Sequence, residues 1–291
     1  MFADLHLHTN FSDGTYTPEE LVEQARRFDL KAIALTDHDT VEGCARTAAA
    51  CHAAGIEFIP ASELTAEMDS HEIHMLGYFL DTANPVLLRE LAKFQQVRQD
   101  RIREMVGRIN SLGIPLPVDD VFTLANCRSP GRPHVARALT EGEFCGSIDE
   151  AFERFLKKGK PAWVPKFKMS AQQAIDLIHQ AGGLAAMAHP GLTRADDLIP
   201  RLAEFGMDGL ECFHTKHNGS LTEQYRSLAT RLNLLITGGS DCHGTTKGRP
   251  IIGTVKLPYE HVEKLKARAT ERAAERGFLL AHSRAPGEVP L

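Results

Sequence analysis

Short apolar runs alternate with amphipathic segments over the first 80 residues and again after Pro165. The runs that predict strands are residues 2–8, 31–36, 55–60, 72–79, 183–188, 208–213 and 234–237. Between them, apolar residues recur at helical spacing, as Leu21, Ala25 and Phe28 do after Pro18, which suits a helix start. The same reasoning predicts helices over 41–54, 170–181, 195–205, 218–231 and 259–276.

The middle of the chain has a different pattern, with helical periodicity and no strand. It predicts a long helix over 86–110 and further helices over 118–126, 132–141 and 147–157. We therefore expect residues 90–160 to form a helical insertion that contributes to substrate binding. Residues 1–89 and 161–291 would form one discontinuous catalytic unit. An independent helical module is the alternative for the middle segment.

Strand–helix alternation outside the insertion predicts an α/β fold. We expect a barrel of parallel strands surrounded by helices, in which chemistry lies at the carboxyl ends of the strands. An open, doubly wound sheet is the competing architecture.

The composition narrows the class of protein. With 291 residues, 43% of them hydrophobic, the chain can bury one large core. It has no apolar run of ~20 residues and no signal-like start, so we expect a cytoplasmic protein without a membrane partner. Six cysteines without CxxC spacing suggest reduced thiols. A net charge of −5 argues against coating of long nucleic acids but permits a small anionic substrate. No obligate protein partner is evident.

The most informative stretch is Asp4-Leu5-His6-Leu7-His8, followed by Asp13. Strand alternation places Asp4, His6 and His8 on one face, where burial without a partner would be costly. Two imidazoles two residues apart at a strand end can bind one metal ion, and Asp13 lies just past a turn.

Further histidines and carboxylates occur near the ends of other predicted strands. The full candidate metal set is His6, His8, Asp13, His38, Glu63, His74, His189, Asp241 and His243. Nitrogen and oxygen ligands without thiolates suit Mn²⁺, Fe²⁺ or Zn²⁺. Nine ligands suggest up to three divalent ions, with Glu63 able to bridge. Any one of these histidines alone could be structural, whereas their joint occurrence predicts a metal site.

These motifs, together with FSDGTYTPEEL, ALTDHDTVEG and Gly131-Arg132-Pro133-His134, resemble the PHP (polymerase and histidinol phosphatase) family over residues 1–81 and 161–250. Within it, the chain is most similar to the TrpH/YciV-type branch, which includes nucleoside 3',5'-bisphosphate phosphatases. The resemblance implies a distorted (β/α)7 barrel with three metal ions per chain.

The resemblance also implies how the ligands divide. His6, His8, Glu63 and Asp241 would hold one ion, and Asp13, His38 and His243 a second. Glu63, His74 and His189 would hold the third. Asp13 stands where many relatives have histidine, which favours Mn²⁺ or Fe²⁺ over Zn²⁺ at the second ion.

The expected reaction is hydrolysis of a phosphate monoester by a metal-bound hydroxide, without a protein nucleophile. His214 is the tentative proton donor or phosphate ligand, although an exposed loop histidine is the alternative. Asp37, next to His38, could orient a ligand imidazole and is not expected to be a catalyst. Glu211 would bind substrate or simply face the barrel.

Substrate selection is expected to come from the insertion. Arg132 and His134 flank Pro133 at a predicted helix start, where free N–H groups favour an anion. This arrangement suits a second phosphate, as in a nucleoside 3',5'-bisphosphate that loses its 3'-phosphate; Arg132 could instead be a structural residue.

Other functions fit the same motifs. A 5'-to-3' exoribonuclease acting on short 5'-phosphorylated oligonucleotides is the nearest alternative. A histidinol-phosphatase-like enzyme and a non-catalytic, metal-bound scaffold are further ones.

Overall fold

Seven strands form a nearly closed barrel. The computed structural model describes residues 1–166, 168–245 and 250–283. The strands lie in the order β8-β7-β6-β4-β3-β2-β1. Their bounds are β1 Phe2–Leu7, β2 Leu30–Leu35, β3 Glu57–Met68, β4 His71–Tyr78, β6 Leu184–Met187, β7 Gly209–His214 and β8 Leu235–Gly239. Two short strands, β5 (Met169–Ser170) and β9 (Leu257–Pro258), pair with β3 and β1.

The barrel closes where the chain leaves β8 beside β1. There the N–H of Asp241 donates to the carbonyl of His6, and the N–H of His8 donates to the carbonyl of Cys242. This closure confirms the predicted α/β barrel over the open sheet.

The prediction that all strands are parallel was wrong, because β4 runs antiparallel to both β3 and β6. β3 continues to Met68, past its predicted end at residue 60, and turns directly into β4. Asp69 and Ser70 form the turn, both with positive φ. That backbone is typical of two-residue hairpin loops, for which Asn-Gly is the usual signal.

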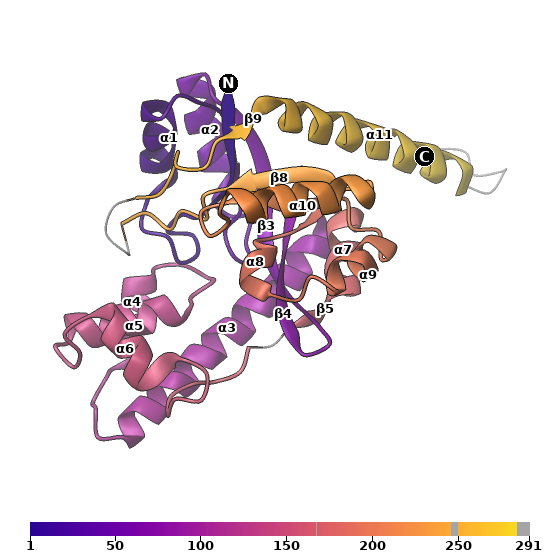
Figure 1. Ribbon diagram of the computed structural model, residues 1–291. Helices are drawn as coiled ribbons and strands as arrows, with labels where there is room; N and C mark the ends of the chain where they lie inside the picture. Colours follow the sequence, from indigo (N-terminus) through magenta and orange to yellow (C-terminus); the bar gives the residue numbers. More distant parts are fainter. Residues whose placement is uncertain (167, 246–249, 284–291) are drawn as a thin grey trace, which may run out of the picture.

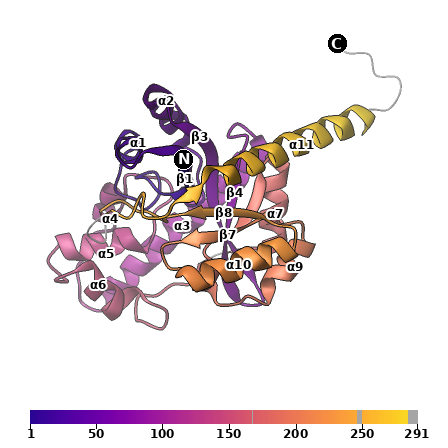
Figure 2. The same ribbon diagram turned by 45° about the horizontal axis from the view of Figure 1, so that its top comes forward.

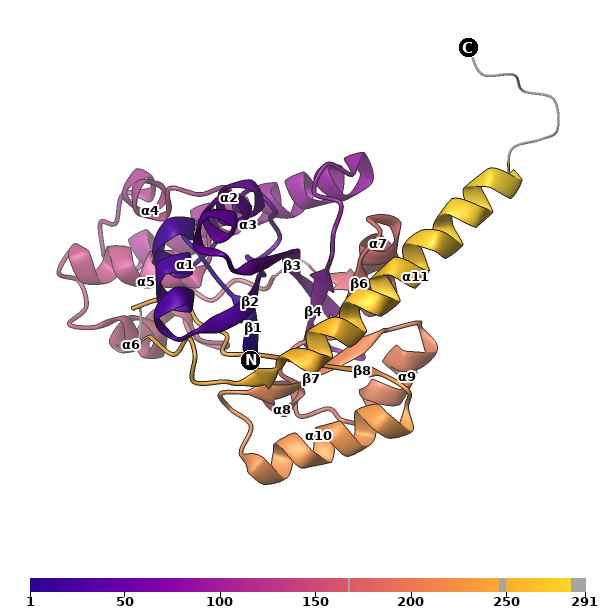
Figure 3. The same cartoon turned by 90° about the horizontal axis from the view of Figure 1, so that it is seen from above.

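Helices cover the outside of the barrel (Figure 3). Their bounds are α1 Pro18–Arg27, α2 Cys44–Ala54, α7 Ala171–Gln180, α8 Pro190–Thr193, α9 Leu198–Glu204, α10 Gly219–Arg231 and α11 Tyr259–Ser283. Thr17 caps α1 in a capping box with Glu20, as the sequence around Pro18 suggests. The helix predicted at 41–54 begins only at Cys44, and α8, β5 and β9 were not predicted.

Alternate residues of β2 divide between two cores. Ile33 and Leu35 belong to the cluster that contains α1 and α2 side chains, whereas the smaller Ala32 and Ala34 pack in a second cluster. Val262 of α11 belongs to this second cluster, so the start of α11 covers one end of the barrel. The rest of α11 extends away from the body (Figure 2). Residues 284–291, which end the predicted catalytic unit, lie outside the described residues.

The insertion lies to one side of the barrel, around the far end of α3 (Figure 1). Its helices are α3 Pro85–Ser111, α4 Val118–Ala125, α5 Arg132–Glu141, α6 Ile148–Ala151 and a π-helical turn at Phe152–Leu156. Leu91 in the first half of α3 packs on the barrel core, and Met105 in the second half packs in a separate core with α4 and α5 side chains. α3 therefore fixes the insertion against the barrel.

None of the helices in the described part of the chain is both long and apolar enough to cross a membrane.

Candidate metal centre and anion pocket

The nine candidate ligands converge at one end of the barrel. His6 is the penultimate residue of β1, and His38 and His189 follow β2 and β6, as predicted. Glu63 and His74 instead lie inside the β3–β4 hairpin, where His74 pairs with Thr65, two residues after Glu63. Their ligand atoms form four overlapping groups, which are His8–Asp13–His38–His243, His6–His8–Asp241, His6–Glu63–His189 and His38–Glu63–His74.

Glu63 lies at the centre of this arrangement and is almost fully buried. One carboxylate oxygen, Oε1, lies 2.7 Å from His74 Nδ1 and 3.2 Å from His189 Nε2. The other, Oε2, lies 3.0 Å from His38 Nδ1 and 3.4 Å from His6 Nε2. His8 Nε2 also lies 3.4 Å from Oε2. The two oxygens thus face different sets of histidines, so this carboxylate could serve two ions.

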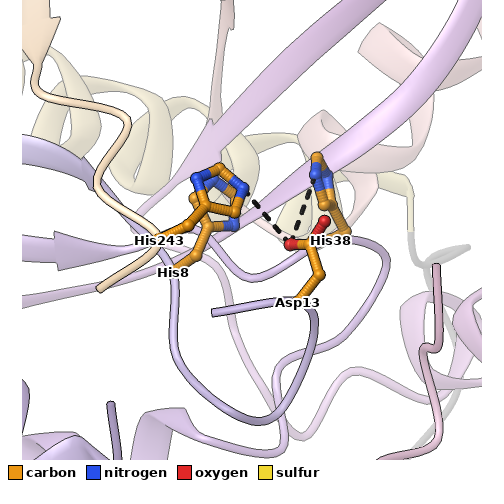
Figure 4. A group of neighbouring side chains, drawn as sticks. All are labelled: His8, Asp13, His38 and His243. Atoms are coloured by element: carbon orange, nitrogen blue, oxygen red, sulfur yellow. Dashed lines mark ion pairs between the residues drawn. The ribbon is translucent and has the colours of Figure 1, made fainter. Parts of the chain in front are cut away.

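Asp13 lies beside a second part of the cluster (Figure 4). Its Oδ1 atom is 3.2 Å from His243 Nε2 and 3.8 Å from His38 Nε2. The rings of His8 and His243 stack with centroids 4.1 Å apart. Asp241 Oδ1 lies 3.3 Å from His8 Nε2 and so connects this group to the first.

Several inward-facing atoms have no hydrogen-bond partner among the described residues. They include Nε2 of His6, Nε2 of His8, Oδ1 of Asp13 and Oε2 of Glu63, all buried. Buried polar atoms are nearly always hydrogen-bonded, so a group of unpaired acceptor atoms facing one another fits a site that binds cations. Imidazole and carboxylate donors suit Mn²⁺, Fe²⁺ or Zn²⁺, so the residues fit divalent ions.

Residues of the cluster also shift the pKa values of their neighbours within it. Burial alone lowers the pKa of His74, but the carboxylate of Glu63 outweighs it and raises the pKa to about 9. Burial likewise disfavours the charged form of His243, whereas Asp13 and Asp241 raise its pKa to about 10. At neutral pH both rings are therefore protonated on both nitrogens and positively charged in the metal-free protein.

We expect metal binding to release protons and to tighten as the pH rises. A metal must displace the protons of His74 and His243, whose raised pKa values keep them protonated below about pH 9. Titration calorimetry with Mn²⁺ in buffers of different ionisation enthalpy counts these protons. Binding that releases no proton at about pH 7, with equal affinity at pH 6 and 8, would contradict this assignment.

Two aspartates act differently from what the sequence suggested. Asp37 accepts hydrogen bonds from the backbone and hydroxyl of Thr9 and from the hydroxyl of Ser12. It therefore holds the loop that carries Asp13, and its prediction as an imidazole partner was wrong.

Asp4 accepts hydrogen bonds from the N–H groups of His6 and Ser240 and is in none of the four ligand groups. A register shift between Asp4 and Leu7 breaks the regular alternation assumed for β1.

His214 is buried beside the cluster and is not an exposed loop residue. The N–H of Lys216 donates to its Nδ1 at 3.1 Å, which places the proton of the neutral ring on Nε2. This Nε2 atom lies 3.7 Å from Asp241 Oδ2.

The insertion residues predicted to bind phosphate occupy the start of α5. The Nδ1 atom of His134 accepts the N–H of Gly131, the N-cap of α5, at 3.0 Å, so this nitrogen of the ring has a structural role. The Arg132 guanidinium lies over the Phe152 ring, 5.8 Å from its centroid, with Nη1 3.4 Å from the carbonyl of Leu156.

Three basic residues that were not predicted from the sequence line a small pocket next to the metal cluster. They are Arg98 and Arg101 of α3, and Lys166. Burial, with Arg132 and Arg98 nearby, lowers the pKa of Arg101 to about 9. Burial, Arg98 and Arg132 also lower the pKa of Lys166, although Glu72 opposes them. In the sequence, the only sign of this pocket is a pair of arginines three residues apart on one predicted helix. Only the fold shows that they lie beside the metal cluster.

This pocket directly adjoins the metal cluster. The Lys166 ammonium lies 2.9 Å from Glu72, whose same oxygen lies 3.3 Å from His74 Nε2. Arg98 Nη2 lies 2.6 Å from Asp39. A Cβ atom built at Gly131 would lie 3.8 Å from Asp13 Oδ2 and 3.9 Å from Arg98 Nη1, so the start of α5 reaches both sites.

Comparisons with known proteins agree with this geometry. Residues 4–116 match the PHP domain family. The 5'-3' exoribonuclease Rnm of Salmonella typhimurium is 34% identical over 249 residues, covering 82% of this chain and 84% of that protein. The 3',5'-nucleoside bisphosphate phosphatase of Chromobacterium violaceum is 32% identical over 264 residues, covering 88% and 92%. A solved structure from Bifidobacterium adolescentis, described as a candidate metal-dependent phosphoesterase, superposes with a TM-score of 0.85 at 32% identity, covering 91% and 96%.

Proposed function

Since the chain belongs to the PHP family of metal-dependent phosphoesterases, we propose that it removes the 3'-phosphate from nucleoside 3',5'-bisphosphates. Adenosine 3',5'-bisphosphate would give 5'-AMP and phosphate. The observation that carries the proposal is a buried group of cationic side chains directly beside the nine-residue cluster.

The cluster would hold up to three divalent ions, with Mn²⁺ preferred and Fe²⁺ or Zn²⁺ as alternatives. Its ligands are His6, His8, Asp13, His38, Glu63, His74, His189, Asp241 and His243. Ions bound there would lower the pKa of water and neutralise charge on the phosphate oxygens. The carboxylates among these ligands belong to the folded protein, so the negative charge of the site is in place before substrate binds.

The basic pocket supports a substrate with two phosphates. Arg98, Arg101, Arg132 and Lys166 approach one another in buried surroundings, which is costly unless an anion offsets their charge. Asp39 and Glu72 neutralise part of it. A phosphate held there by Arg132 would leave the other phosphate at the metal ligands. A histidinol phosphate carries a single phosphate and would leave the pocket empty.

His214 is suited to help the leaving group. Its Nε2–H can donate to a phosphate oxygen or to the departing ribose hydroxyl, because its Nδ1 is occupied by the Lys216 N–H. Its burial keeps the ring in one orientation.

A second candidate function is 5'-to-3' exoribonuclease activity on short 5'-phosphorylated oligonucleotides. The relative from Salmonella typhimurium carries that name, and the basic pocket would accept a terminal 5'-phosphate equally well. Both substrates present a phosphate ester one nucleoside away from a 5'-phosphate.

The test is a direct comparison of the two substrates with Mn²⁺ present. Rapid release of phosphate and 5'-AMP from adenosine 3',5'-bisphosphate, with slow cleavage of a 5'-phosphorylated RNA oligomer, supports the phosphatase. Efficient stepwise release of mononucleotides makes the exoribonuclease primary. Turnover of histidinol phosphate alone, or of no ester at all, overturns both.

Replacing Arg132 by alanine is expected to raise KM for adenosine 3',5'-bisphosphate by about 10–100-fold, since one charge-assisted hydrogen bond is lost. Hydrolysis of p-nitrophenyl phosphate, which has no second phosphate, should change little. Arg137→Ala is a matched control, because Arg137 is on the same helix and faces Glu141 at the surface. An equal loss on both substrates would disprove the role of Arg132.

A further inference from the structure

Glu211 lies on β7 with its side chain fully buried, directly behind the metal cluster. It is outside all four groups of candidate ligands. Its two carboxylate oxygens nevertheless contact two different ligand residues, one through a side chain and one through the backbone.

The first contact concerns the His6 ring. Glu211 Oε1 lies 3.0 Å from His6 Nδ1, so an Nδ1–H can donate to this carboxylate. That bond leaves the Nε2 lone pair directed at the centre, where it lies 3.4 Å from Glu63 Oε2. A neutral histidine has one proton to place, and a carboxylate on Nδ1 selects the tautomer that a metal requires on Nε2.

The second contact concerns the backbone of His189. Its N–H donates to Glu211 Oε2 at 2.7 Å. His189 has φ 28° and ψ 57°, an unfavourable conformation for a residue with a Cβ atom. The bond from Glu211 helps to hold this conformation, in which His189 Nε2 lies 3.2 Å from Glu63 Oε1.

We propose that Glu211 is a positioning residue that couples two metal subsites. Its carboxylate orients the ring of His6, which lies near Oε2 of Glu63. The same carboxylate holds the backbone of His189, whose ring lies near Oε1 of Glu63. This inference rests on the metal centre proposed above. It assigns Glu211 a specific part in that centre, whereas the sequence left it between substrate binding and a barrel-facing role.

Glutamine tests the proposal because it keeps the shape of the side chain. Its single carbonyl oxygen can accept from His6 or from His189 but not from both, and its NH₂ group would oppose the remaining donor. We expect Glu211→Gln to weaken Mn²⁺ binding by about 10–100-fold, measured by titration calorimetry without substrate.

Asp208→Asn is a matched control. Asp208 precedes β7, is largely buried, and also contacts a histidine and a backbone N–H, namely His179 at 2.8 Å and Ala185 at 2.9 Å, both through Oδ2. It is not one of the grouped ligands. Its replacement should lower stability and leave Mn²⁺ affinity unchanged.

Weaker Mn²⁺ binding in Glu211→Gln alone supports the proposal. Wild-type affinity in that variant, or an equal loss in Asp208→Asn, overturns it. A wild-type protein that binds no Mn²⁺ overturns the proposed function itself. If Glu211→Gln does not fold, Glu211→Asp replaces it, because the shorter carboxylate cannot span both contacts; wild-type affinity there overturns the proposal as well.

A second measurement reports on the ring directly. Nitrogen-15 NMR of the Zn²⁺-loaded wild type should show His6 protonated on Nδ1 and bound through Nε2. A metal-bound Nδ1 would overturn the proposal whatever the affinities are.

Discussion

Replacing Glu63 by glutamine is expected to lower kcat/KM for phosphate ester hydrolysis by about 1,000-fold, corresponding to roughly 4 kcal/mol. Each oxygen of this carboxylate faces a different set of histidines, and an amide NH₂ would present hydrogens to the centre in place of a lone pair. Metal analysis of the purified variant, alongside kinetics with Mn²⁺, should show that the loss follows from lost metal.

Glu67→Gln is the control for this change. Glu67 lies on the same strand, is exposed, and pairs with Lys168 at 2.8 Å. It should retain wild-type metal content and activity. A Glu63→Gln protein that keeps both its metal and most of its activity would show that Glu63 does not bridge ions.

Replacing Gly239 by alanine is expected to cost at least about 3 kcal/mol of unfolding free energy. A Cβ atom at this position would overlap the backbone nitrogen and the Cβ of His6. Neither can move without separating β8 from β1, where the barrel closes. Urea unfolding of the metal-free protein measures the loss of stability.

Gly107→Ala provides the comparison. Gly107 is exposed within α3, four residues before the helix ends at Ser111, and a Cβ there would meet open space. Alanine should stabilise that helix by about 0.5–1 kcal/mol. Equal effects at Gly107 and Gly239 would mean that contact between β8 and β1 does not limit residue size at the closure.

Much of the barrel could be predicted because its strands are short apolar runs between helices with clear periodicity. The β3–β4 hairpin was missed because Asp69-Ser70 is a weak turn signal. Its strand pattern was readable, since Leu64, Ala66 and Met68 alternate with more polar residues. β5 and β9 have two residues each, too few for any pattern.

The convergence of the metal cluster was predictable because histidines and carboxylates stood out among apolar strands. Glu63 could be proposed as a bridge from the excess of ligands alone. Residues that act through tertiary contacts could not be found in this way. Arg98 and Lys166 are ordinary surface-type residues in the sequence, and only the packing of α3 places them beside the metal cluster. Glu211 likewise becomes interpretable only through its contacts with His6 and His189.

The measurement that tests the metal centre most directly is anomalous diffraction at the manganese edge from crystals grown with Mn²⁺. We predict peaks within bonding distance of Glu63, with His6, His8 and Asp241 around one and His74 and His189 around another. A third is expected beside Asp13, His38 and His243. Crystals with no ion contacting Glu63 would contradict the assignment of this cluster as a metal centre.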